Sequence, residues 1–125
     1  MLQEINNPES VEGNLIRKWF TDEFFDLFVW SDNKGEIASF QLCYDKGRDE
    51  HALTWKRPSS YYHQRVDDGE NRPGKSKSTP VLMADGMFDF RKISARFKTE
   101  SADIDQVISG FVSDKLLAFG RQTLA

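Results

Sequence analysis

Large apolar side chains concentrate in two runs near the middle of the chain, residues 24–30 and 37–44. In both runs aromatic and branched residues occupy both sets of alternating positions, and a polar segment containing Gly35 separates them. Because alternate side chains of a strand point to opposite faces, the pattern predicts a β-hairpin that is covered on both faces. Gly35 can adopt the positive φ that such a loop requires. We expect this hairpin to form the middle of a sheet.

Four further segments carry β-type patterns between turn residues such as Pro58 and Gly69. They are predicted to be extended and comprise residues 51–55, 61–66, 79–83 and 88–97. Residues 71–78 contain no large apolar side chain and are expected to form a mobile loop. Two alternatives stay open for residues 7–20: a short helix or irregular segment, which we favour, or a strand over 15–20.

The C-terminal segment has the clearest helical spacing. Its apolar stripe consists of Ile104, Val107, Ile108, Phe111, Val112, Leu116 and Phe119. Asp103 and Gln106 are spaced as a capping box at the start, and Gly120 suits the end. We therefore predict a single α+β domain over residues 1–125. It has a largely antiparallel sheet of about six strands, open or curled toward a barrel, with the C-terminal helix packed on one face.

The composition suits one folded core, with 13% aromatic residues and a single cysteine that cannot form an intramolecular disulfide. Cys43 lies inside an apolar run and is expected to be a small buried hydrophobe. No signal peptide and no apolar segment of the ~20 residues needed to cross a membrane is seen. We expect a cytoplasmic protein without a membrane partner.

Charge is distributed unevenly along a chain whose net charge is only −3. Residues 1–70 carry a net charge of −6, whereas residues 71–98 carry +5. The basic stretch 72–98 also contains phenylalanines, a combination found in proteins that bind single-stranded nucleic acid. A pI near 5.4 argues against this function, so nucleic-acid binding through 72–98 is kept only as an alternative.

Candidate chemistry gathers on the predicted strands 51–55 and 61–66. His51, His63 and Asp67 are of the types that form a metal site or a general acid–base pair. In an antiparallel pair, opposing residue numbers have a constant sum. An even sum, for example with His51 opposite Asp67, puts both histidines on one face, and an odd sum separates them. Apolar matching favours the odd sum, so an enzyme using these residues is an alternative, and no metal site or cofactor is predicted.

Residues 40–46 and 52–55, followed by His63 and the segment 66–70, resemble a family of small uncharacterised bacterial proteins. The resemblance covers the chain from residue 19 to about residue 97. It implies a bacterial, cytoplasmic origin. No activity is assigned to that family, so it implies no functional residue.

No assembled catalytic motif is present, and our leading hypothesis is a non-catalytic module that binds a protein partner or a small ligand. The ligand-binding candidates are Tyr61, Tyr62, His63 and Arg65, on a predicted strand beside the predicted loop. An unpaired edge strand could also pair with its copy in a homodimer.

Overall fold

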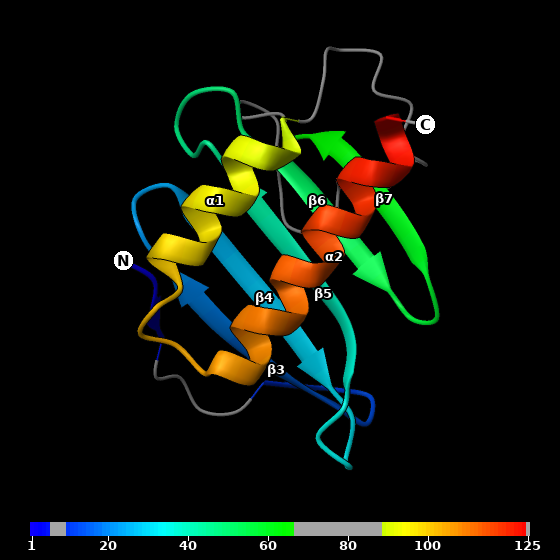
Figure 1. Ribbon diagram of the computed structural model, residues 1–125. Helices are drawn as coiled ribbons and strands as arrows, with labels where there is room; N and C mark the ends of the chain where they lie inside the picture. The colour runs from blue at the N-terminus through cyan, green and yellow to red at the C-terminus, as the bar shows by residue number, and fades with distance from the viewer. Residues whose placement is uncertain (6–9, 67–88, 125) are drawn as a thin grey trace. The chain divides into compact units, whose positions relative to one another are not determined.

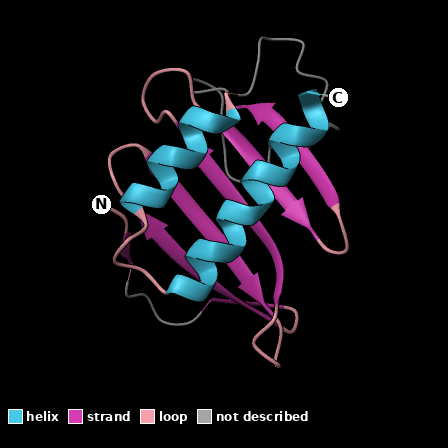
Figure 2. Cartoon of the chain, in the orientation of Figure 1, coloured by secondary structure: helices cyan, strands magenta, loops and turns pink. Residues whose placement is uncertain are grey.

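The computed structural model describes residues 1–5, 10–66 and 89–124 (Figure 1, Figure 2). Within these residues seven strands precede two helices. The strands are β1 (Gln3–Glu4), β2 (Ser10–Glu12), β3 (Leu15–Thr21), β4 (Phe25–Ser31), β5 (Ile37–Tyr44), β6 (His51–Lys56) and β7 (Ser60–Arg65). The helices are α1 (Phe90–Glu100) and α2 (Gln106–Leu124). The predicted α+β class is confirmed.

The chain forms two compact units. One contains the sheet from Glu4 onward, and the other contains residues 1–3 with the two helices. In the helical unit, the backbone N–H of Leu2 donates to the carbonyl of Glu100 at 2.8 Å. Neither described helix is long and apolar enough to span a membrane. That the C-terminal helix packs on the sheet stays a prediction, as does the single domain.

The sheet is antiparallel and open, with strand order β1-β3-β4-β5-β6-β7 and β2 paired to β3. Figure 1 labels β3 to β7 of this order. From β3 to β7 each strand pairs with the next one along the chain. In the described residues the order ends at β1 and β7, so the sheet does not close into a barrel. The predicted strand 79–83, the loop 71–78 and Asp67 lie outside the described residues.

The predicted hairpin is confirmed as the middle of the sheet, with β4 beside β5. Leu27 lies opposite Leu42 and Val29 opposite Phe40, and Gly35 in the connecting loop has a φ of 83°. These side chains belong to a face that we call the buried face. Its fully buried members are Phe20, Phe25, Leu27, Val29, Phe40, Leu42 and Leu53. Burial of each stabilises the fold by about 1.5–3 kcal/mol.

Residues 10–21 form the hairpin of β2 and β3, so the favoured helix was wrong and the alternative strand is confirmed. Gly13 in the turn has a φ of 66°, a left-handed conformation that glycine adopts without strain. Along β3 the side chains alternate, with Phe20 buried while its neighbour Trp19 faces the other side. This two-residue period favours a strand.

The predicted extended segment 88–97 was also wrong, because the described part of it forms α1. Its buried residues Phe90, Ile93, Ser94 and Phe97 lie three or four positions apart, which is the spacing of one helix face. The carboxylate of Asp89 accepts from the backbone N–H of Lys92 at 3.2 Å and caps the first turn.

The C-terminal helix is confirmed, but its start differs from the predicted capping box. The helix begins at Gln106, and the carboxylate of Asp105 accepts from the backbone N–H of Val107 at 2.9 Å. The side chain of Gln106 donates to three carbonyls of the preceding turn, at 2.8–3.1 Å. It is therefore used against backbone acceptors, and Asp103 lies outside the helix.

Gly120 does not end α2, which continues to Leu124. A Cβ at this position would collide with the ring of Phe90, so the glycine permits close approach of α1 to α2. The hydroxyls of Ser101 and Ser109, 2.6 Å apart and both buried, share a hydrogen bond in the same unit.

Candidate functional site: the aromatic face of the sheet

The sheet presents a second face, opposite the buried one, that carries aromatic and basic side chains. Trp19 lies opposite Phe28, and Arg17 lies opposite Trp30. Toward the other edge of the sheet, Lys56 on β6 and Tyr62 on β7 lie on this same face by the same alternation. We call these six residues the aromatic face: Arg17, Trp19, Phe28, Trp30, Lys56 and Tyr62. All are half-buried except Lys56, which is exposed.

The aromatic rings of β3 and β4 form a continuous row. Trp19 stacks on Phe28 with ring centroids 5.7 Å apart and an interplanar angle of 17°. Phe28 in turn lies 6.4 Å from Trp30. The guanidinium carbon of Arg17 lies 5.5 Å from the centroid of Phe28, within the range of a cation–π contact. The row is thus held in place by its own side chains before any ligand arrives.

Two basic side chains, Arg17 and Lys56, also lie on this face. The ammonium of Lys56 lies 5.9 Å from the ring centroid of Tyr62. Neither Arg17 nor Lys56 forms an ion pair with a carboxylate of the described residues. Along β3 to β7, Asp26 is the only carboxylate whose position falls on this face.

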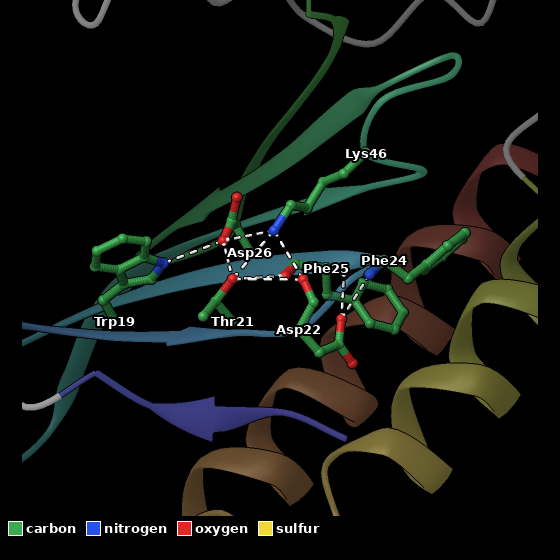
Figure 3. Close-up of polar contacts among 7 residues, drawn as sticks. All are labelled: Trp19, Thr21, Asp22, Phe24, Phe25, Asp26 and Lys46. Atoms are coloured by element: carbon green, nitrogen blue, oxygen red, sulfur yellow. Dashed lines mark hydrogen bonds and ion pairs between the residues drawn. The ribbon is translucent and has the colours of Figure 1, made fainter.

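The carboxylate of Asp26 belongs to a polar cluster at the end of the row, in which its charge is offset by an ion pair and hydrogen bonds (Figure 3). Its Oδ1 accepts from the indole Nε1–H of Trp19 at 3.1 Å and from the hydroxyl of Thr21 at 2.6 Å. The ammonium of Lys46 lies 3.3 Å from the same oxygen and donates to the carbonyl of Asp22 at 2.8 Å. The cluster therefore fixes the orientation of Trp19 and offsets the charge of Asp26.

The turn between β3 and β4 is closed by a second aspartate. Oδ1 of Asp22 accepts from the backbone N–H groups of Phe24 and Phe25 at 2.8 and 2.7 Å (Figure 3). Such side-chain bonds to the backbone two and three residues on stabilise a tight turn. The turn sets the register that places Trp19 opposite Phe28.

Cys43 is buried, with 8% of its surface exposed, which confirms that it is a small buried hydrophobe. Burial, with smaller effects from the carboxylates of Glu50 and Asp26, raises the pKa of its thiol to about 12. A thiol that stays protonated is a poor nucleophile.

The favoured odd register between β6 and β7 was wrong. His51 lies opposite Arg65 and Leu53 opposite His63, an even sum that brings both imidazoles to the buried face. Apolar matching misled because it counted His63 as a polar side chain. In the sheet its ring packs between aromatic neighbours and its nitrogen is hydrogen-bonded, so burial costs little.

Three rings meet at this place on the buried face. His51 and His63 stack with centroids 5.3 Å apart, and Tyr44 lies 5.8 and 6.0 Å from them. The hydroxyl of Tyr44 and Nε2 of His63 share a hydrogen bond of 2.6 Å. Nδ1 of His51 lies 2.8 Å from the carbonyl of Asp49; a carbonyl only accepts, so Nδ1 carries the proton. All three rings are at most 9% exposed.

The four predicted ligand-binding residues do not share one face. Tyr61, His63 and Arg65 alternate with Tyr62, which alone belongs to the aromatic face. Burial raises the pKa of Tyr61. Arg65 is exposed and pairs with Asp49 at 2.8 Å. A ligand on either face can therefore contact only part of the predicted set, whose role in binding stays a prediction.

Sequence reasoning missed the residues that form most of the aromatic face. Trp19 and Arg17 fell in the segment expected to be helical, which concealed their pairing with Phe28 and Trp30. The signal that could have found them is the alternation of Arg17, Trp19 and Thr21 against Phe20.

Comparisons with protein-family models, with curated proteins and with solved structures gave no significant match to this chain. Among the residues that the structure describes, no group of three His, Cys, Asp or Glu side chains is arranged to hold a metal ion.

Proposed function

We propose that this protein is a non-catalytic binding module and that its ligand contacts the aromatic face. The observation that carries the proposal is the half-buried row of Trp19, Phe28 and Trp30 with Arg17 stacked upon it. Trp, Tyr and Arg are the residues most enriched where binding energy concentrates in protein interfaces. A cytoplasmic, bacterial setting, as the sequence predicts, is part of this proposal.

The row is also suited to binding because little order must be imposed on it. Trp19 is held by the hydrogen bond to Asp26, and Phe28 is held between ring and guanidinium neighbours. Ordering a mobile side chain at an interface costs about 0.5–1.5 kcal/mol, so a pre-ordered row binds with a smaller entropic loss.

NMR spectra of the indole N–H groups test the proposal directly. The chain has three tryptophans, of which Trp19 and Trp30 lie on the aromatic face and Trp55 is buried on the other face at 4% exposure. We would titrate ¹⁵N-labelled protein with a library of small fragments. Binding fragments are expected to shift the signals of Trp19 and Trp30 and to leave that of Trp55 unchanged. Shifts confined to Tyr44, His51 and His63 would contradict the assignment.

A second candidate function is supported by the even register. It is the small acid–base enzyme using His51 and His63 that the sequence offered as an alternative, with Tyr44 as a third residue of the site. Asp67, its predicted partner, lies outside the described residues. The burial of all three rings weighs against it, because a substrate must reach the imidazoles. If fragments shift these three rings and the shifts disappear in His63→Gln, the enzyme becomes the better hypothesis.

A further inference from the structure

We propose that the occupant of the aromatic face is an acidic segment of another protein, with carboxylates that pair with Arg17 and Lys56 and apolar side chains that pack on the tryptophans. The inference rests on the proposed function and adds the chemical class of the partner. It follows from the charge, the ring geometry and the composition of the face.

The aromatic face carries two cations on a chain whose net charge is negative. The chain carries a net charge of −3, whereas the aromatic face presents Arg17 and Lys56 without a described carboxylate partner. The one carboxylate that β3 to β7 place on this face, Asp26, is paired with Lys46 and accepts three hydrogen bonds. Two cations that pair with no carboxylate of the described residues, beside apolar rings, attract an anionic, partly apolar ligand.

The position of Arg17 favours a carboxylate in particular. A guanidinium packed over an aromatic ring keeps its N–H groups available around its edge, where a carboxylate can accept two parallel hydrogen bonds. Because Arg17 is half-buried and already positioned by Phe28, little freedom is lost when that pair forms. Lys56, exposed at the far side of the face, acts as a less directional charge.

The rings favour a protein over single-stranded nucleic acid. Nucleic-acid-binding sheets use free ring faces on which bases stack. Here Phe28 is engaged by both Trp19 and Arg17. A second copy of this chain is disfavoured too, because symmetric contact would bring the cations of two aromatic faces together.

The test is selection from a phage-displayed library of random 12-residue peptides against the full chain. We expect the enriched peptides to combine Asp or Glu with aromatic or aliphatic residues. Arg17→Gln is expected to weaken their binding at least tenfold by fluorescence polarisation. The matched control is Lys18→Gln, which removes the same charge one residue away, at an exposed position that faces the other side of β3. It should leave the affinity within twofold.

Each contrary result is distinguishable. Peptides that need Trp19 and Trp30 but are neutral or basic would overturn the acidic partner and leave the proposed function standing. Acidic peptides whose binding is unchanged by Trp30→Ala and Arg17→Gln would overturn both. Failure to enrich any peptide, or displacement of the peptides by a 20-nucleotide oligo(dT) whose affinity falls steeply with salt, would also overturn the protein partner. Circular dichroism of each variant confirms that it is folded.

Discussion

Two glycines inside α2 offer a matched pair for which one substitution has opposite expected effects. Gly110 is exposed, and a Cβ built there meets nothing within 4 Å. Gly120 is buried, and a Cβ there collides with the ring of Phe90. Replacing each by alanine separates the intrinsic helix preference of the residue from the packing of α1 against α2.

The magnitudes follow from these two environments. Alanine is favoured over glycine inside a helix by about 1 kcal/mol, so Gly110→Ala should stabilise the protein by about that amount. Gly120→Ala gains the same preference but must displace a buried ring. Overpacking costs about 1–3 kcal/mol and sometimes more. Since the ring of Phe90 has atoms on the site that the new methyl group would occupy, we expect a net loss of about 1–3 kcal/mol.

Urea unfolding followed by circular dichroism at 222 nm measures both effects. In thermal unfolding of the same variants, a change of 1 kcal/mol corresponds to about 4 °C in Tm for a chain of 125 residues. In a Phe90→Ala background the collision is absent, so Gly120→Ala should no longer destabilise, and the double-mutant cycle isolates the contact. Equal shifts of the same sign for Gly110→Ala and Gly120→Ala would refute this account of the helix pair.

Three further predictions concern the sheet. Asp26→Asn removes the charge that Lys46 neutralises, and should reduce the unfolding free energy by about 1–2 kcal/mol; in a Lys46→Met background the loss should be smaller, and additive losses in a urea-unfolding cycle would exclude the pairing. Tyr44→Phe leaves Nε2 of His63 without this hydrogen-bond partner and should cost about 1–3 kcal/mol, and an unchanged urea midpoint would show that the bond contributes nothing. Because burial raises the pKa of Cys43 to about 12 from an ordinary value of 9.0, alkylation by iodoacetamide at pH 8 should be about a thousandfold slower than in the urea-unfolded chain. The folded state favours the neutral thiol, so the free energy of unfolding should fall as pH rises above the pKa that this thiol has in the unfolded chain. Equal alkylation rates of the folded and unfolded chains, measured by mass spectrometry, would place the thiol in solvent instead.

The middle of the sheet could be predicted because its local signals agree. In 24–30 and 37–44, apolar residues occupy both alternating sets, and Gly35 lies where the loop needs positive φ. In 88–97 the signals conflict, because Ile93, Ala95 and Phe97 alternate as in a strand. The helical set is visible only when Phe90 and the cap Asp89 are included.

The candidate site was harder to predict, because it depends on register between strands. Arg17 and Trp30 are neighbours only once β3 pairs with β4, and no periodicity within either segment specifies that pairing. The faces of β6 and β7 were predicted in the wrong register for a related reason. Counting apolar residues gives no weight to a hydrogen bond such as the one between Tyr44 and His63, which lets an imidazole occupy the buried face.

The register of β6 and β7 links the two faces of the sheet. Placing His63 beside Tyr44 on the buried face puts Tyr62 on the aromatic face, within cation–π distance of Lys56. A slip by one residue would turn Tyr62 inward and His63 outward, so the buried hydrogen bond and the exposed cation–π contact would be lost together. The buried cluster of Tyr44, His51 and His63 therefore holds in place one of the two cations of the proposed binding face. In the proposed binding module, the buried histidines would therefore have a structural role that requires no catalysis.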